Sequence, residues 1–562
     1  MEVEPSFRVL GFAASRNNRP LGAYCIAHGK SRGSVIPHTP VTPLRSLEIF
    51  VPLDEPEADA IAHAARVAGY EPSTVRVTVT RRSLDARKGH PIGFRLEVAI
   101  WPADAAVVDV EEALTAPVRA RAGSHVVVVG TGPCGTYAAL RLTDAGARVT
   151  LVDIGKPVQP RRHDLASLTQ RGVLDPASNY CFGEGGAGTF SDGKLYTRTK
   201  DRRAVRSVLR ALVTHGADPD ILVDSRPHVG SNRLPKILMA QRADLEARGA
   251  TYVWSDGVVD LLLSGDRVAG VRCASGRELV GDAVVLAVGH SARPIYELCH
   301  RRGVALEPKP FAVGARVEHP QPLIDRIQYG RAHGHPRLPA AFYHLTATVP
   351  TPDAGDRGVY SFCMCPGGWV VDSSTEEGAL CVNGMSLKRR DSPFANAALV
   401  VTVEPRDYLG RFGDGPLAGI ELQRAIERRA FALGGGSFVA PAQRLTDFVA
   451  RRPTSQPLGS SYRPRVGGGD VRAALPPFVG DALERALARF QRTMPGFSGP
   501  EAQLVGVETR TSSPVRIVRD DGLVSPTHRG LYPAGEGAGY AGGIVSAAVD
   551  GMRVADAILA AL

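Results

Sequence analysis

The fold is decided at residues 126–153, which run VVVVGTGPCGTYAALRLTDAGARVTLVD. This pattern indicates a buried strand, a tight turn, a helix and a second strand. Gly130, Gly132 and Gly135 have the G-x-G-x-x-G spacing. In that spacing the first glycine makes the turn, the second lets the backbone approach a pyrophosphate, and the third lets the helix pack on the strand. A helix that begins at such a turn directs its N–H groups and its dipole toward phosphates.

An acidic residue closes this unit. The second strand stops at Asp153, about 20 residues after the first glycine, where an acceptor for a ribose hydroxyl is expected. A G-x-G-x-x-G motif alone is weak evidence, but strand, helix, second strand and terminal acid together favour dinucleotide binding. The alternative is a glycine-rich strand–helix turn that binds no ligand.

The composition is ordinary for a globular protein of two or three domains. The chain has 562 residues, of which 44% are hydrophobic and 22% charged, and its net charge is +10. A positive charge could serve nucleic acid or an acidic substrate, or it could reflect a composition rich in arginine. The basic residues are scattered and form no dense tract, which argues against nucleic acid as a partner.

The cysteines and the apolar runs indicate where the protein is found. The 8 cysteines are dispersed, without a close-set disulfide framework or a C-x-x-C pair, so we expect neither secretion nor a metal site. The first residues, MEVEPSFRVL, lack the pattern of a signal peptide, and no apolar run approaches 18 residues. We therefore expect a cytoplasmic protein without a membrane span.

The N-terminal part predicts a small α+β unit. Residues 1–43 show little periodicity and are expected to form an irregular extension. A strand over 44–53, a helix over 56–70 and two alternating strands near 75–80 and 94–100 follow, so residues 44–115 are expected to form a ferredoxin-like domain. The polar segment RRSLDARKGH, residues 81–90, is interpreted as a solvated connection or as a contact to a ligand.

Two segments after Asp153 are candidates for phosphate contact. Lys156, Arg161 and Arg162 lie in GKPVQPRRHD, either near the nucleotide or in a solvated loop. The next segment, residues 179–200, is dense in glycine and predicts a flexible loop or a backbone cradle. The residues of this loop expected to contact the cofactor are Gly185, Gly186, Thr189, Ser191 and Lys194.

The C-terminal segment repeats the first theme. Residues 531–562 predict a strand, a glycine-rich turn and a helix, with Gly535, Glu536 and Gly542 in the turn and Gly543 and Ile544 where the helix begins. A helix N-terminus there suits the N1–C2=O edge of a reduced flavin, where negative charge develops.

Three blocks from distant parts of the chain together resemble a known superfamily. The G-x-G-x-x-G turn, AVGHSAR at 287–293 and AGEGAGYAGGIVSAA at 534–548 are similar to FAD proteins of the glutathione-reductase-like superfamily, which have two dinucleotide-binding folds. With FGEGGAGTFSDGKL at 182–195 and GVETRTSSPVRI at 506–517, the chain resembles more closely a bacterial family of uncharacterised FAD-dependent dehydrogenases.

This resemblance implies an α/β fold with FAD as cofactor. It implies a Rossmann-like FAD-binding domain built from residues 116–310 and 501–562, with an inserted α+β substrate domain at 311–500. The first three glycines would face the pyrophosphate and Asp153 the adenosine ribose. Further contacts implied for FAD are Val258 and Val259 near adenine, Gly289 after the AVG strand, Glu536 near the ribityl chain or pyrophosphate, and Gly543 and Ile544 at the pyrimidine edge.

The sequence shows no second G-x-G-x-x-G unit between residues 156 and 500. A built-in NAD(P)H domain, usual in reductases with two such folds, is therefore not expected. NAD(P)H could still dock transiently at the flavin.

Catalytic candidates lie in three places. Arg510, with Glu508 and Ser512, could bind a carboxylate or another anion, or it could form an internal ion pair of Glu508 with Arg510 or Arg516. His290 could be a general acid or base, or a structural turn residue. Cys363 and Cys365 would share one face of a strand, as a redox pair or as buried free thiols.

Three hypotheses for function stay open. The first is an FAD-dependent oxidoreductase that transfers a hydride between the flavin and a small organic substrate, anionic if Arg510 binds it. An external electron donor or acceptor would complete the reaction. The second is a flavin-dependent monooxygenase, and the third is an FAD-containing protein that modifies or binds RNA.

Overall fold

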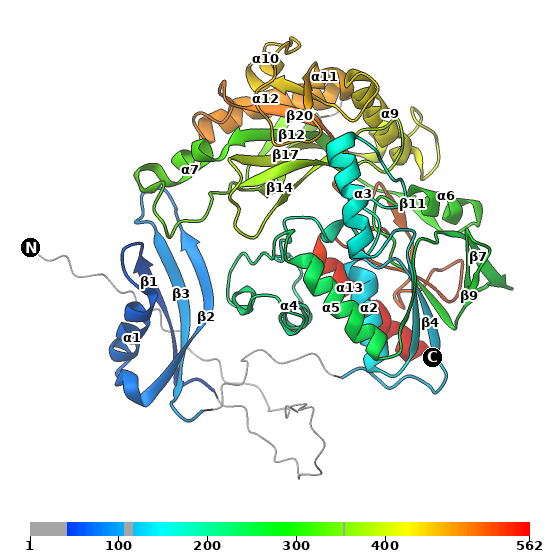
Figure 1. The fold of residues 1–562 in the computed structure, drawn as a ribbon, viewed down its shortest axis with the longest axis horizontal. Coiled ribbons are helices and arrows are strands. Elements are labelled where there is room, and N and C mark those ends of the chain that lie inside the picture. The colour runs from blue at the N-terminus through cyan, green and yellow to red at the C-terminus, as the bar shows by residue number, and fades with distance from the viewer. Residues whose placement is uncertain (1–41, 106–115, 352–354) are drawn as a thin grey trace, which may run out of the picture.

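The computed structural model describes residues 42–105, 116–351 and 355–562 (Figure 1). Of the extension expected at residues 1–43, the structure describes only residues 42 and 43. Residues 106–115, the end of the expected 44–115 domain, also lie outside the described residues.

A parallel sheet of five strands forms the first part of the core. Its order is β22 (Leu531–Pro533), β10 (Ala283–Leu286), β4 (His125–Val129), β5 (Arg148–Val152) and β6 (Thr251–Val253), and every neighbouring pair is parallel. Segments distant in sequence thus meet in one sheet. The strand–helix–strand predicted from the glycine motif, the predicted AVG strand and the predicted closing strand are all confirmed.

The four valines of β4 explain why this sheet is covered on both faces. Val126 and Val128 pack with α2 (Pro133–Asp144), α5 (Leu234–Ala247) and α13 (Ile544–Ala561). Val127 and Val129 point to the opposite face, where β7 (Val258–Ser264), β8 (Arg267–Cys273) and α6 (Arg293–Arg301) cover them. A strand buried on both faces is apolar throughout, as parallel strands commonly are.

Helices α2 and α13 lie side by side at very close range (Figure 1). A Cβ atom at Gly551 of α13 would come within 2.1 Å of the Cys134 carbonyl oxygen of α2. The C-terminal helix is thus packed directly against the helix that follows the glycine motif.

A second sheet of seven strands forms the other part of the core. Its order is β13 (Thr346–Thr351), β14 (Gly355–Cys365), β17 (Phe394–Val403), β12 (Phe311–Pro320), β20 (Gln503–Glu508), β18 (Ala440–Arg444) and β19 (Val466–Gly468). Its pairs are antiparallel except β18 with β19. Residues 311–500 contain both strands and helices, as expected of an α+β segment, with long helices α9 at Ala418–Leu433 and α12 at Pro477–Thr493.

A third, smaller sheet lies near the N-terminus. Its order is β1 (Arg45–Pro52), β3 (Gly93–Pro102) and β2 (Val75–Asp85), and α1 (Glu57–Val67) packs on it. The expected connection over 81–90 is wrong in its first half, because residues 81–85 continue β2. The charged side chains of this segment form ion pairs: Arg82 pairs with Glu57, and Asp85 pairs with Arg87 and Arg95.

The clearest error of the sequence analysis is α3 (Val158–Arg171), where we expected a loop. The segment holds two prolines and no local N-cap, and the cap comes from far away. The Val158 amide donates to the Glu184 carboxylate at 2.7 Å. A helix whose end is satisfied by a distant side chain leaves no local signal in the sequence.

The remaining elements connect these parts of the fold. They are α4 (Arg202–Thr214), β9 (Glu278–Val280), β11 (Leu306–Pro308), α7 (Gln321–Tyr329), β15 (Gly368–Asp372), β16 (Val382–Ser386), α8 (Pro405–Tyr408), α10 (Leu445–Val449), α11 (Val471–Ala474), β21 (Val515–Ile517) and the 3-10 turns Pro72–Thr74, Gly186–Gly188, Pro219–Leu222 and Gly330–Ala332. No helix of the described residues is long and apolar enough to cross a membrane.

Candidate cofactor and substrate site

One cavity connects the two large sheets. Its volume is ≈ 1770 Å³, whereas pockets for small ligands commonly measure about 300–1,000 Å³. The residues after the carboxyl ends of β4, β5 and β10 line one end, which is where open α/β sheets bind ligands. Residues of β13, β14 and the segment after β20 line the other end. The cavity has room for a dinucleotide and a second molecule.

The three glycines of the motif have different steric roles. Gly130 has φ +100°, and a Cβ there would meet the Ala287 carbonyl oxygen at 2.4 Å. A Cβ at Gly135 would lie 1.9 Å from the Gly130 carbonyl oxygen, so this glycine lets α2 pack on the turn. Gly132 is open, because its Cβ would have only Gly186 within 4 Å, at 3.9 Å. Gly130 and Gly132 line the cavity, and Gly135 does not.

Asp153 lies at the cavity wall and organises two loops. One carboxylate oxygen accepts from the Thr131 amide at 2.9 Å and its hydroxyl at 2.6 Å. The other accepts from the amides of Gly155 at 2.8 Å and Gly183 at 3.1 Å. Asp153 therefore ties the glycine turn to the segment that follows β5, besides any contact to a ribose.

The buried side chain of Arg161 holds the glycine-rich loop. From α3 it donates to the carbonyl oxygens of Asn179, Tyr180, Glu184 and Gly186 at 2.7–3.0 Å, and to the Thr189 hydroxyl at 3.1 Å. A fully engaged guanidinium fixes the path of this backbone. The loop is a fixed turn rather than a flexible segment.

The predicted loop residues divide into those that line the cavity and those that support it. Gly186, Ser191 and Lys194 line it. Gly185, with φ +77°, and the buried Thr189 lie behind the wall. Arg162, predicted to contact the cofactor, is exposed on α3 and outside the cavity lining, since the helix turns it away.

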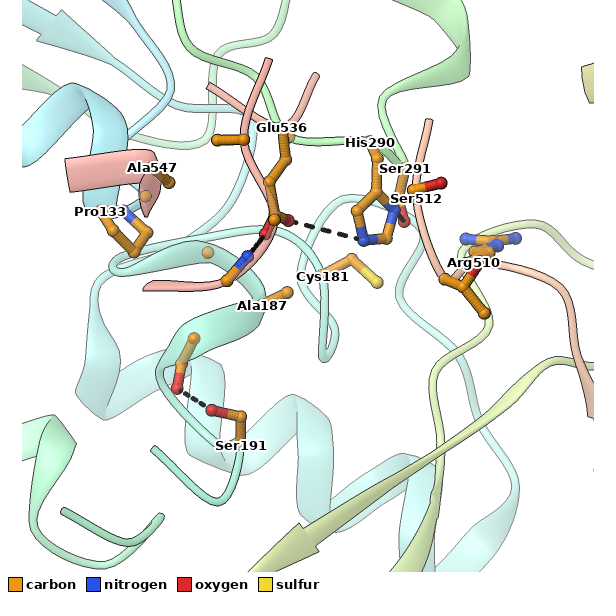
Figure 2. Close-up of a pocket in the computed structure, with 18 of the residues that line it drawn as sticks. Pro133, Cys181, Ala187, Ser191, His290, Ser291, Arg510, Ser512, Glu536 and Ala547 are labelled. Carbon is orange, nitrogen blue, oxygen red and sulfur yellow. Dashed lines mark hydrogen bonds and ion pairs between the residues drawn. The ribbon is translucent and has the colours of Figure 1, made fainter. Parts of the chain in front are cut away.

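The closing turn brings His290 and Glu536 together (Figure 2). One carboxylate oxygen of Glu536 lies 3.7 Å from His290 Nε2, and the other accepts from the Gly543 amide where α13 begins. Burial lowers the pKa of His290; Glu536 opposes this shift, and Arg510, Lys309 and Arg293 reinforce it. His290 is therefore neutral near pH 7, beside the helix N-terminus.

The rest of the closing turn is open to a ligand. Gly289, Gly542, Gly543 and Ile544 line the cavity, and a Cβ at any of the three glycines would have no heavy atom within 4 Å. Gly535 lies behind the wall, where a Cβ would be 2.9 Å from Cys134 Cβ. Together with Gly132, these open backbone positions fit an extended nucleotide whose phosphates and ring edge approach the main chain.

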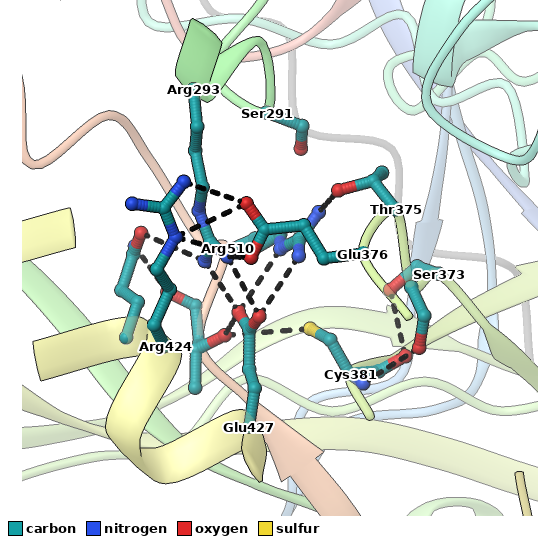
Figure 3. Close-up of polar contacts among 12 residues, drawn as sticks. Ser291, Arg293, Ser373, Thr375, Glu376, Cys381, Arg424, Glu427 and Arg510 are labelled. Carbon is teal, nitrogen blue, oxygen red and sulfur yellow. Dashed lines mark hydrogen bonds and ion pairs between the residues drawn. The ribbon is translucent and has the colours of Figure 1, made fainter. Parts of the chain in front are cut away.

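Arg510 has a partner that the sequence did not indicate (Figure 3). Its Nε and Nη2 donate to the buried carboxylate of Glu427 on α9 at 3.0 and 2.9 Å, and its Nη1 donates to the Thr375 hydroxyl at 2.6 Å. Arg293 donates to the same carboxylate at 2.8 and 3.0 Å. The alternative considered from the sequence, an ion pair of Glu508 with Arg510 or Arg516, does not form.

Glu508 instead pairs with Arg316 of β12, at 2.7 Å between fully buried groups. Burial raises the pKa of Glu508 to about 7, and Arg316 limits this shift. Glu508 does not line the cavity, whereas Arg510 and Ser512 do. The predicted catalytic segment therefore presents Arg510 and Ser512 to a ligand and keeps Glu508 behind them.

The remaining predicted residues lie at two parts of the wall. Val258 lines the cavity, and its neighbour Val259 is exposed and outside the lining, because successive residues of β7 face opposite ways. Cys363 lines the cavity and Cys365 is buried behind it. Sequence reasoning missed Glu427, Arg293, Arg316 and the supporting role of Arg161, because their partners are far away in the chain.

The fold is that of an α/β protein with a parallel sheet, and the cavity lies at the carboxyl edge of that sheet, where such folds bind dinucleotides. Residues 310–511 match the family described as FAD-dependent protein, C-terminal domain-like. A protein of Clostridium beijerinckii, named only as an uncharacterized protein, is 40% identical over 504 residues, which cover 86% of this chain and 92% of that protein. The chain belongs to the same family as this Clostridium protein, its residues 310–511 match a domain family of FAD-dependent proteins, and FAD is its cofactor.

Solved structures with a similar fold are more distant. Glycine oxidase from Bacillus cereus is 12% identical with a TM-score of 0.33, and the match covers 78% of this chain and 95% of that one. Glycerol-3-phosphate dehydrogenase from Bacillus halodurans, complexed with FAD, is 11% identical with a TM-score of 0.34, covering 79% and 65%. Similarity at this level of sequence identity gives no information about the substrate of this chain.

Proposed function

We propose that this protein is an FAD-dependent oxidoreductase that transfers a hydride between the flavin and a small organic molecule. The observation that supports it is the single cavity, which runs from the nucleotide-type glycine turn to a polar wall on the antiparallel sheet. FAD would supply the hydride chemistry, and the protein would position it.

The first part of the cavity would hold the cofactor. Gly132 and the N-terminus of α2 would face the pyrophosphate, and Val258 would lie near the adenine. The N-terminus of α13, at Gly543 and Ile544, would favour negative charge at the pyrimidine edge of the reduced ring.

The other part of the cavity would hold the substrate. Among the described residues, Arg510 has partners for three of its five N–H groups, so it is held in place and can still donate. Ser512 offers a hydroxyl beside it, and neutral His290 can accept or deliver a proton. This set favours a substrate with a carboxylate or similar anion next to the carbon that gives or takes the hydride.

Anaerobic reduction of the flavin tests the proposal. The holoprotein would be mixed with a panel of small metabolites, half of them carboxylates and half matched neutral amides or esters, with NADH and NADPH included. We expect rapid bleaching by a carboxylate and not by its neutral counterpart. If dithionite reduces the flavin, no panel member or nicotinamide does, and no panel member reoxidises it, the proposal is wrong. Bleaching by NAD(P)H, followed by oxygen uptake with a hydroxylated product, would favour a monooxygenase.

A further inference from the structure

Cys363 and Cys365 are brought together by a distortion of β14. The pairing of β14 with β17 shifts register between Phe362 and Cys365, and Cys363 has φ +46°, a left-handed conformation that is rare for a residue with a side chain. Strain of this kind persists only where the surrounding structure imposes it, often at functional sites. Here it places the Cys363 side chain at the cavity wall with Cys365 directly behind it.

One partly buried ammonium contacts both thiols. Lys194 Nζ lies 3.7 Å from Cys363 Sγ and 3.5 Å from Cys365 Sγ. Arg316 Nη2 is 3.7 Å from Cys365 Sγ and donates to the Cys363 carbonyl oxygen at 2.7 Å. Cys365 Sγ donates to the Cys363 carbonyl oxygen at 3.3 Å. The neighbouring Cys365, with Lys194 and Arg316, lowers the pKa of Cys363 below that of an ordinary thiol.

Among the described residues, the cations around the pair outnumber the carboxylates. Asp192 pairs with Arg390 at 2.7 Å, and Glu508 pairs with Arg316 at 2.7 Å. Lys194 shares Asp192 at the longer distance of 3.6 Å. The other titratable groups near Lys194 are neutral at pH 7, because burial raises the pKa of Tyr196 and lowers that of His228 to about 4.

A buried ammonium is costly unless an anion neutralises it. Deprotonation of Cys363 supplies that anion at the thiol of the pair that lines the cavity, as Lys194 does. Cys363 is therefore placed as the exposed, reactive thiolate and Cys365 as the inner thiol.

We propose that Cys363 and Cys365 are a redox-active pair that exchanges two electrons with the flavin bound in the same cavity. The pair rests on the proposed function, because the flavin is its electron partner. As the sulfur–sulfur bond forms, the Cys363 thiolate and the Cys365 thiol together lose two electrons and one proton. Oxidised FAD takes up both electrons and that proton to give the anionic reduced flavin. The reverse reaction breaks the bond and restores thiolate and thiol.

The pair also indicates an external substrate class. Of the two thiols, only Cys363 lines the cavity, so it would attack a small disulfide and form a mixed disulfide with it. Cys365 would then attack Cys363 Sγ of that mixed disulfide and release the rest of the substrate as a thiolate. The leaving thiolate takes the Cys365 proton, and the pair is left oxidised for reduction by the flavin.

An anaerobic dithionite titration of the air-oxidised holoprotein tests the proposal. We expect the wild type to take up twice the reducing equivalents that its flavin alone requires. Cys363→Ser and Cys365→Ser should take up only those of the flavin. Cys273→Ala is the matched control, because Cys273 is a buried thiol of β8 that does not line the cavity, and it should behave as the wild type.

Alkylation with peptide mapping gives a readout without turnover. Before reduction, iodoacetamide should label neither Cys363 nor Cys365, and a cross-linked peptide should appear. After reduction, Cys363 should react at pH 7 on the order of tenfold faster than in Lys194→Met, because the thiolate is the nucleophile. Lys194→Arg, which keeps the charge, should restore most of that rate.

The possible failures are distinguishable. A yellow protein that takes up only the equivalents of its flavin, with both cysteines labelled before reduction, overturns the redox pair and leaves the proposed function intact. A protein that contains no flavin overturns the proposed function, whatever the peptide map shows.

Discussion

At the scale of single residues, the glycine turn shows how one motif combines three steric demands. Gly130 needs a left-handed backbone, Gly135 needs the absence of a side chain against the turn, and Gly132 needs neither. Of the three glycines, only Gly132 can be substituted to test ligand binding rather than folding, because a side chain there would point into the open cavity.

Gly132→Val should remove FAD from a folded protein, because a branched side chain would fill the space of the pyrophosphate. Flavin content per chain should fall at least about tenfold, because the pyrophosphate can no longer approach the main chain at this position. Gly415→Val is the matched control: no heavy atom lies within 4 Å of a Cβ there, and it is outside the cavity lining. Equal flavin content in both variants would contradict the placement of the pyrophosphate.

Arg510→Ala should reduce both stability and turnover. The change removes one of two arginines that neutralise Glu427, a loss of roughly 1–3 kcal/mol. If Arg510 also binds substrate, kcat/KM per bound flavin should fall on the order of ten- to a hundredfold.

Arg293→Ala separates these two roles. Arg293 donates to the same Glu427 carboxylate but does not line the cavity. We expect it to lower the melting temperature as Arg510→Ala does while kcat/KM per bound flavin stays near that of the wild type. If both variants lose kcat/KM equally, the role of Arg510 is to hold Glu427.

Site residues that belong to a local sequence motif were predictable from the sequence. Their hydrogen-bond and ion-pair partners were not. Gly130, Gly132, Asp153, Arg510 and Ser512 were expected at the ligand and line the cavity, whereas the predicted Gly135, Gly185 and Gly535 lie behind its wall. The partners of Arg510 and Glu508 lie 83 and 192 positions away in the chain. Nothing in a sequence window connects such groups, so the ion pairs considered between neighbours were wrong.

At the scale of elements, α3 is the helix that supports the cofactor loop. Five acceptors of the loop depend on Arg161, and Glu184 of the same loop caps the helix in return. Helix and loop therefore form one structural unit although both segments were expected to be loops.

Arg161→Met should disorder this unit, because several buried acceptors lose their donor at once. At about 1–3 kcal/mol for each unsatisfied group, we expect a loss on the order of 3 kcal/mol or more and weaker FAD binding. The adjacent, exposed Arg162→Met should change stability by less than about 0.5 kcal/mol. Denaturant unfolding and flavin content of both variants check this, and similar losses in the two would contradict it.

Strand β12 carries a buried histidine that should make stability depend on pH. His319 is fully buried, its Nε2 hydrogen bonds to the Phe497 carbonyl oxygen at 2.8 Å, and burial lowers its pKa to about 4. The unfolded chain, with an ordinary histidine pKa near 6.5, binds the proton first as the pH falls. Stability is therefore complete above about pH 6.5 and is lost progressively toward pH 4, by about 3 kcal/mol at the lower limit.

His319→Gln tests this dependence, because its amide can still donate to the carbonyl oxygen and does not titrate. Between pH 6.5 and 4 the free energy of unfolding should fall less steeply in the variant than in the wild type. Parallel curves would show that His319 is not the titrating group.

At the scale of the whole molecule, the fold class of each of the two large parts was predictable from the sequence. Apolar strands beside the glycine turns indicated a Rossmann-like FAD-binding domain, and the segment 311–500 was expected to form an inserted α+β domain. The order of the seven strands was not predictable, because β20 pairs with β12 across almost two hundred residues. The domain boundaries, the N-terminal extension and the cytoplasmic location stay predictions.

The central claim is that the cavity between the sheets holds one FAD per chain without a covalent bond. The most direct test is the absorbance spectrum of the purified wild-type protein, followed by acid precipitation and identification of the released nucleotide. We expect a yellow protein that releases FAD into the supernatant, close to one equivalent per chain. A colourless protein, or one that releases an adenine nucleotide without flavin, would contradict the account.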